Sequence, residues 1–115
     1  MDTSFMENWA TQLRKGLLEL CILNAIKGNR VYGYEVVKKL RDVKGLVISE
    51  GTIYPILSRF KQEGLVRTTL EESQEGPARK YYELTAKGTA LLSLMNEHWD
   101  TIKRGADAIR QEKER

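Results

Sequence analysis

Residues 49–88 constrain the fold of this 115-residue chain more tightly than any other segment. Ser49–Val66 (SEGTIYPILSRFKQEGLV) is typical of a short helix that ends at Gly64. Apolar residues at positions i, i+3, i+4 and i+7 give this helix a core-facing side: Ile53, Ile56, Leu57 and Phe60. Gly76–Gly88 (GPARKYYELTAKG) is typical of a strand that returns from a hairpin and leads into another helix.

A short helix followed directly by a basic-tipped hairpin is the pattern of a winged helix-turn-helix, a DNA-binding fold. The predicted fold class is mainly α (α+β), a winged helix-turn-helix with a long C-terminal dimerisation helix. Residues 1–84 would form the DNA-binding domain, including an N-terminal helix, and residues 85–115 the dimerisation helix. Two further helices are predicted before the third, over about Trp9–Lys27 and Tyr34–Val43. The hairpin strands are predicted over Leu65–Leu70 and Lys80–Leu84, around a tip at Glu71–Pro77. Thr85 is expected to cap a final helix that reaches about Glu112.

Three local features near the start of the third helix lead to further expectations. Leu46–Ile48 is an apolar, extended link that could add a strand to the hairpin. Ser49 is a good N-cap residue for the helix. Pro55 lies inside the helix, and its nitrogen cannot donate a hydrogen bond to the Gly51 carbonyl. The proline therefore predicts either a late helix start or a bend in the first turns.

Two pairs of tyrosines are expected to divide between core and surface. Either Tyr32 or Tyr34 should lie in the core, with the other free to donate its hydroxyl to a phosphate. Tyr82 has the same strand parity as Leu84, so it is the expected core residue of the second pair, and Tyr81 should lie on the other face.

Composition and charge bound the class of protein. Hydrophobic content of 41% and charged content of 30% fit a globular chain, and no uncharged stretch is long enough to span a membrane. No secretion signal is visible in the sequence. The single cysteine, Cys21, is expected to be a small, buried hydrophobic residue. These features favour a cytoplasmic protein. The net charge of +3 is weak support for nucleic-acid binding, because residues 49–88 carry six Lys/Arg and six Asp/Glu.

The outward side of the third helix is predicted to enter a DNA major groove, which is about 12 Å wide. Its residues are mostly small or flat, which suits close approach, while Tyr54 and Arg59 provide a longer reach. Arg79 and Lys80 place two cations where the hairpin returns from its tip, beside a minor groove or the phosphate backbone. The candidate DNA-binding residues are Tyr34, Lys38, Ser49, Gly51, Thr52, Tyr54, Pro55, Ser58, Arg59, Arg79 and Lys80. The alternative for each is an ordinary solvated residue, and for Lys38 the two interpretations are evenly balanced.

The last predicted helix carries an apolar stripe that a domain of this size cannot fully cover. Roughly 27 residues of helix would be about 40 Å long. Self-association is the simplest explanation, because two-fold symmetry matches a palindromic DNA site. The candidate dimer-interface residues are Leu13, Leu17, Leu20, Leu91, Met95, Trp99, Ile102 and Ile109. Trp99 is expected to anchor the interface, and the alternative is that it lines a cavity between subunits and stacks a flat aromatic ligand.

Catalytic and metal-binding chemistry finds little support in the sequence. The chain has one histidine, His98, and lacks a Cys/His cluster, a phosphate-binding glycine loop and a convincing nucleophile–base pair. We therefore expect no enzymatic activity, no metal and no cofactor.

The chain resembles the PadR family of bacterial transcriptional regulators. The matching pieces are YGYE at Tyr32–Glu35, SEGTIYPILSRF at Ser49–Phe60, EGLV at Glu63–Val66 and GPARKYYELTAKG at Gly76–Gly88. The resemblance implies a winged helix-turn-helix dimer, usually a repressor, that dimerises through its first and last helices. Because it has a single C-terminal helix, the chain is similar to the short subfamily of these regulators. Some members of that subfamily bind planar aromatic compounds at the dimer interface. Trp99 lies at a compatible place.

The predicted function is therefore a homodimeric transcriptional regulator that binds double-stranded DNA at a pseudo-palindromic operator. It would act as a repressor, and a small aromatic effector would release it. The alternative is a ligand-binding or protein-interaction dimer that uses the winged fold as a scaffold without binding DNA. The weak net charge favours this alternative.

Overall fold

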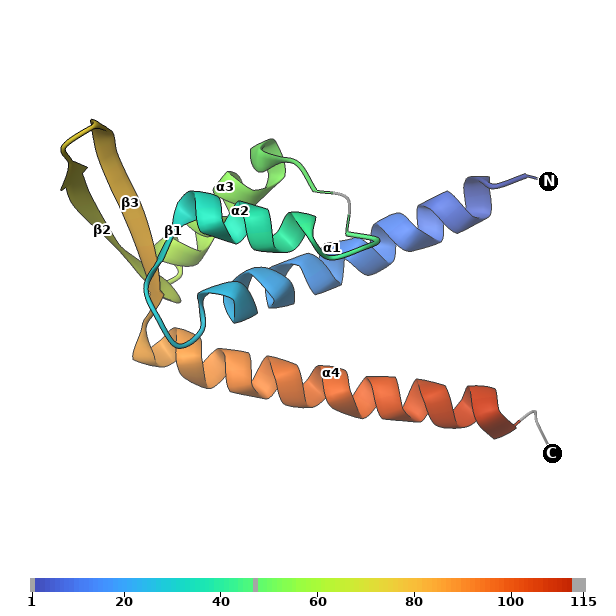
Figure 1. Ribbon diagram of the computed structural model, residues 1–115. Helices are drawn as coiled ribbons and strands as arrows, with labels where there is room; N and C mark the ends of the chain where they lie inside the picture. The colour runs from blue at the N-terminus through green and yellow to red at the C-terminus, as the bar shows by residue number, and fades with distance from the viewer. Residues whose placement is uncertain (1, 47, 113–115) are drawn as a thin grey trace.

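The computed structural model describes residues 2–46 and 48–112, so Val47 of the expected extended link lies outside the described residues. The elements follow one another as α1 (Ser4–Ile26), β1 (Val31–Tyr32), α2 (Gly33–Arg41), α3 (Glu50–Gln62), β2 (Val66–Ser73), β3 (Gly76–Leu84) and α4 (Ala86–Glu112). Figure 1 shows α1, α2 and α3 gathered beside the β2–β3 hairpin, with α4 leading away from the foot of β3. This arrangement confirms the predicted fold class, a winged helix-turn-helix with a long C-terminal helix.

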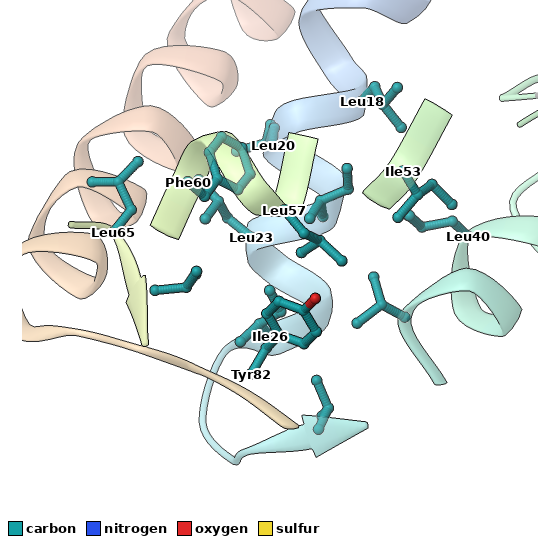
Figure 2. Packing of buried hydrophobic residues seen from close by; sticks show 14 of the residues in the cluster. Leu18, Leu20, Leu23, Ile26, Leu40, Ile53, Leu57, Phe60, Leu65 and Tyr82 are labelled. Carbon is teal, nitrogen blue, oxygen red and sulfur yellow. The ribbon is translucent and has the colours of Figure 1, made fainter. Parts of the chain in front are cut away.

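The hydrophobic core lies where α1, α2 and α3 meet (Figure 2). Side chains with no exposed surface come from all three helices: Ile22 and Ile26 of α1, Val36 and Val37 of α2, and Ile53 and Leu57 of α3. Tyr82 of β3 and Leu92 of α4 also belong to this cluster, so the predicted core role of Tyr82 is confirmed. Because burying one large aliphatic side chain contributes about 1.5–3 kcal/mol, the cluster fixes α3 firmly against α1 and α2.

The sheet is antiparallel with the strand order β1-β3-β2. Its third strand is Val31–Tyr32, which pairs with Tyr82 and Tyr81 of β3. The expectation that Leu46–Ile48 supplies this strand is wrong. Leu46 instead buries its side chain in the hydrophobic core. An apolar side chain can be buried from a loop as well as from a paired strand, so its hydrophobicity alone does not predict a strand. The hairpin strands also run further than predicted and leave only Gln74 and Glu75 between them.

Helix α3 begins at Glu50, directly after Ser49, so a late start caused by Pro55 is wrong. The helix runs without interruption through Pro55 to Gln62. Ser49 occupies the N-cap position, but its hydroxyl makes no capping bond to the backbone and lies 3.2 Å from the Thr52 hydroxyl. Gly64 ends the helix with φ of 78°, a conformation that favours glycine.

Helix α1 begins at Ser4, one and a half turns before the predicted start near Trp9. The Asp2 carboxylate accepts hydrogen bonds from the Ser4 backbone N–H at 2.9 Å and the Ser4 hydroxyl at 2.8 Å. These bonds lower the pKa of Asp2 and support the first turn of the helix. Apolar periodicity alone missed this turn, since Phe5, Met6 and Trp9 are exposed in the structure.

Thr85 joins the wing to α4, as predicted for a helix cap. Its hydroxyl accepts from the Gly88 N–H at 3.0 Å and donates to the Gly64 carbonyl at 2.6 Å. Gly88 packs directly on the backbone of Leu65, where a Cβ would lie 2.0 Å from the carbonyl oxygen. The base of α4 is therefore fixed to the end of α3 and the start of β2.

The two long helices extend away from the winged body and diverge. In Figure 1 the N-terminal end of α1 and the C-terminal end of α4 lie far apart, while their inner ends lie side by side. The molecule measures 62 × 35 × 21 Å along its principal axes. Much of the length of both helices therefore lacks a covering layer from the same chain.

Candidate nucleic-acid interface

The outward face of α3 forms the centre of the candidate interface. Ile53, Leu57 and Phe60 turn inward, with exposures of at most 2%. The opposite face is exposed and contains every residue predicted on this helix to meet DNA: Gly51, Thr52, Tyr54, Pro55, Ser58 and Arg59. An α-helix is about 10–12 Å across with its side chains, so a face of this kind fits a major groove.

The first turn of α3 presents small polar groups. The exposed Ser49 and Thr52 hydroxyls lie 3.2 Å apart. A Cβ on Gly51 would meet only the Ser49 hydroxyl, at 3.8 Å, so the backbone there is open to close approach. Helix N-termini favour anionic groups such as phosphate because their N–H groups point outward. Glu50 opposes this preference, although its carboxylate forms an ion pair with Arg41 at 3.2 Å.

Tyr34 and Tyr54 lie at the junction of α2 and α3 and are 41% and 37% exposed. The Tyr54 ring packs over Gly33, where a Cβ would come within 3.3 Å of it. Partial burial, followed by the nearby Glu50 carboxylate, raises the pKa of Tyr54, so its hydroxyl stays protonated at neutral pH. A protonated phenol can donate a hydrogen bond to a phosphate.

The cations of α2 differ in their availability. Lys39 donates to the Ala25 carbonyl at 3.3 Å, and Arg41 pairs with Glu50. Lys38 is exposed and makes no hydrogen bond or ion pair within residues 2–46 and 48–112. It is therefore the α2 cation best placed to meet a phosphate.

Arg59 is tied to the rest of the molecule rather than extended into solvent. Its guanidinium forms an ion pair with Glu19 of α1, lies 3.6 Å from the Glu63 carboxylate and lies 5.4 Å from the Phe60 ring centroid. The hydrogen bond and charge of Glu19 raise the pKa of Arg59. No local pattern predicts the Glu19 contact, because the two residues are brought together only by the packing of α1 on α3.

Arg79 and Lys80 lie on the return strand of the wing, but they point to opposite faces. Arg79 is paired across the hairpin with Glu71, and Lys80 with Leu70. The Arg79 guanidinium lies 5.0 Å from the centroid of the Tyr32 ring. Arg30, which sequence reasoning missed, stacks 4.4 Å from the Tyr81 ring and forms an ion pair with Glu71.

A second surface lies between α1 and α4. It is an open apolar groove with a volume of about 830 Å³. Six predicted dimer-interface residues line it: Leu13, Leu17, Leu20, Met95, Trp99 and Ile102. The other two, Leu91 and Ile109, lie outside the groove, with exposures of 36% and 68%. His98 also borders the groove, and the described residues contain no cluster of ligands suited to a metal ion.

The sequence profile of the transcriptional regulator PadR-like family matches residues 22–94. The chain belongs to the PadR-like family. The matched segment includes α2, α3, both strands of the wing and the first third of α4, so it contains most of the candidate interface. As a member of a family of transcriptional regulators, this PadR-like chain is not an enzyme. None of its described helices is long and apolar enough to cross a membrane.

Solved structures of PadR-like proteins agree with the fold. A PadR-like transcriptional regulator from Bacillus cereus is 41% identical, with a TM-score of 0.78 over 87% of this chain and 97% of that one. A PadR family regulator from Eggerthella lenta is 27% identical, with a TM-score of 0.79 over 93% of each chain. A comparison of sequences also finds a transcriptional regulator of Mycobacterium tuberculosis, which is 30% identical over 82 residues. These residues cover 71% of this chain and 75% of the relative.

Proposed function

We propose that this PadR-like regulator is a homodimeric repressor that binds a pseudo-palindromic operator through α3 and the wing. The observation that carries the proposal is the exposed face of α3, small and polar, beside a hairpin that presents cations. The proposed DNA-contacting set is the one predicted from sequence except Arg79, which lies on the other face of the wing from Lys80. Tyr34 and Lys38 of α2 flank α3. Because its ligand is chromosomal DNA, the proposed place of action is the cytoplasm.

The charge distribution supports a contact that depends on shape. Arg41 and Arg59 are both paired with carboxylates, so they contribute little free positive charge to the surface. Few phosphate contacts imply a shallow dependence of affinity on salt. Specificity would then come from the close fit of Gly51, Pro55 and Ser58 into the groove.

A second copy of the chain is the proposed occupant of the groove between α1 and α4. Its walls are apolar, and they carry Ile102 at 50% and Leu13 at 42% exposure in the single chain. Two-fold pairing would place the two α3 helices on successive major grooves, about 34–36 Å apart. One winged domain alone would bury less DNA surface than a dimer does.

Trp99 supports the proposal of an aromatic effector. It is partly buried, borders the groove and lies 5.8 Å from the Lys103 ammonium. A flat compound could stack on its ring, and binding there would alter the angle between the two subunits. Release of DNA would follow from the change in spacing between the α3 helices.

The second candidate is a dimer that binds ligands or proteins without binding DNA. The even charge balance of residues 49–88 favours it, because DNA-binding surfaces are normally rich in unpaired cations.

Fluorescence anisotropy with labelled DNA from the region upstream of the protein's own gene separates these candidates. We expect saturable binding at low salt that Ser58→Asp removes, since a carboxylate on the outward face of α3 would meet phosphates. Ser93→Asp in α4 is the matched control, because it places the same charge at another exposed helical serine. If the unmodified protein shows no binding at low salt, the repressor function is wrong. Equal losses in both variants would show that the outward face of α3 is not the contact.

A further inference from the structure

The two cations of the wing have different surroundings, although they are neighbours in sequence. Successive residues of a strand point to opposite faces of a sheet. Arg79 shares its face with Tyr81 and with Tyr32 of β1, while Lys80 shares its face with Leu70 and Tyr82. The hairpin register therefore assigns them to separate surfaces.

The face that carries Lys80 is the one turned toward the helices. Tyr82 on this face is 6% exposed, and its ring lies beside that of Tyr54, since a Cβ on Gly33 would come within 3.3 Å of both. Tyr54 belongs to the outward face of α3. Lys80 lies two residues from Tyr82 toward the tip, about 7 Å further along the strand. It thus projects from the same side of the wing as the proposed DNA surface.

Lys80 has no competing partner in the part of the chain that the structure describes. It is exposed, and it forms no hydrogen bond, ion pair or ring contact there. Its cross-strand neighbour Leu70 is 66% exposed. A lysine in this setting is free to meet a phosphate.

Arg79 has a different set of contacts, which tie the wing to the start of α2. Its guanidinium lies 5.0 Å from the Tyr32 ring, and the Tyr32 ring lies 5.9 Å from that of Tyr81. Arg30 completes the stack on Tyr81 and pairs with Glu71 of β2. Tyr32 is the residue before α2, and its backbone N–H donates to the Glu35 carboxylate at 3.0 Å.

The backbone gives the wing little other support. Strand β1 has two residues, and its pairing with β3 ends at Tyr32 and Tyr81. Beyond that point towards the tip, β2 and β3 pair only with each other. The Arg79–Tyr32 contact lies just past the last β1 pair, where it can limit movement of the hairpin relative to α2 and α3.

From this geometry we infer that Arg79 is a positioning residue, which holds the wing by stacking on Tyr32, and that Lys80 alone makes the wing's phosphate contact. The inference rests on the proposed DNA binding and assigns separate roles within that surface. Removal of Lys80 removes one phosphate contact per wing. Removal of Arg79 leaves that contact in place and loosens the hairpin that presents it.

The salt dependence of DNA binding tests the assignment. For Lys80→Ala, the slope of log K against log salt should become shallower by about 0.9 for each wing that touches DNA. For Arg79→Ala, the slope should match that of the unmodified protein while affinity falls about two- to fivefold per wing. Tyr32→Leu should cause the same loss, and the double variant with Arg79→Ala should lose no more than either alone. A shallower slope for Arg79→Ala, an unchanged slope for Lys80→Ala, or additive losses would overturn the assignment.

Hydrogen exchange of the free protein provides a test that needs no DNA. Arg79→Ala should speed amide exchange in β1 and β3, and Lys80→Ala, the matched control on the same strand, should not. Equal exchange in Arg79→Ala and the unmodified protein would contradict the positioning role. If the unmodified protein fails to bind any DNA, the proposed function is wrong, and the exchange measurement still decides whether Arg79 holds the wing.

Discussion

Asn24 of α1 and Asn96 of α4 exchange two side-chain hydrogen bonds, with Nδ2···Oδ1 distances of 2.9 and 3.0 Å. Both amides are half-buried. Buried or half-buried polar pairs allow only one register, because any shift leaves both amides without a partner. The reciprocal contact thus helps to set the register between the two helices that border the groove.

Asn96→Ala should lower the free energy of unfolding by about 1 kcal/mol, since it leaves the half-buried Asn24 amide without its partner. The double replacement Asn24→Leu with Asn96→Leu should cost less than the two single leucine variants combined, because it removes both amides together. Urea unfolding of the four proteins measures these values. A double variant that costs the full sum would show that the pair does not act as a unit.

Gly88→Ala should destabilise the protein by about 1–3 kcal/mol, because the added methyl group overlaps the Leu65 backbone and α4 must shift. Gly105→Ala in the same helix is the matched control. Nothing lies within 4 Å of a Cβ at Gly105, so alanine there should stabilise α4 by about 0.5–1 kcal/mol. If urea unfolding shows that the two alanine variants change the free energy of unfolding in the same direction, the close packing of α4 on Leu65 is contradicted.

Glu19→Gln should steepen the salt dependence of DNA binding, by up to about 0.9 in the log–log slope per protomer. The replacement releases Arg59 from its ion pair with α1 and allows it to reach a phosphate. Glu7→Gln, at the other end of α1, makes the same charge change without touching Arg59 and should leave the slope unchanged. Fluorescence anisotropy over a range of salt concentrations measures both, and equal slopes for Glu19→Gln and the unmodified protein would show that Arg59 does not reach DNA.

Ile102→Asp should convert the proposed dimer to a monomer at micromolar concentration, because a carboxylate would be buried without a partner in the proposed interface. The dissociation constant should rise by about a hundredfold or more. Leu70→Asp is the control, since it changes an exposed leucine of the wing in the same way. Sedimentation equilibrium distinguishes the two, and an Ile102→Asp protein that stays dimeric would place the interface elsewhere.

Titration with planar aromatic compounds should quench the fluorescence of Trp99. The experiment requires a Trp9→Phe background, because Trp9 is the other tryptophan of the chain and is 52% exposed. Trp99→Phe in the unmodified chain is the control, and its remaining Trp9 emission should not respond. No quenching across a broad panel would leave Trp99 as a packing residue of the proposed interface.

Periodicity and turn residues predicted most of the fold correctly. The spacing of Ile53, Leu57 and Phe60 identified the buried side of α3, and strand parity identified Tyr82 as a core residue. The errors concern elements whose signal is not local. The two-residue strand β1 is too short to leave a pattern, and Leu46 can be buried either in a strand or in a loop.

The candidate interface was predictable only as a set of exposed positions. Which side chains are free depends on contacts between residues distant in sequence, such as Arg59 with Glu19 and Arg79 with Tyr32. Arg59 and Lys38 have the same formal charge and similar predicted positions, yet one is paired and the other is not. Spacing alone does not predict this difference, because Glu19, the partner that holds Arg59, comes from another element.

The sequence by itself determined the order of the four helices and the hairpin, the buried side of α3 and the family to which the chain belongs. These properties follow from local hydrophobic periods of 3.6 and 2 residues and from glycines at the helix ends. Only the tertiary structure decided how the wing's cations divide between its faces, which arginines are held by carboxylates, and where α1 and α4 leave a groove. Those outcomes depend on the distances between elements, which packing sets and local sequence does not encode.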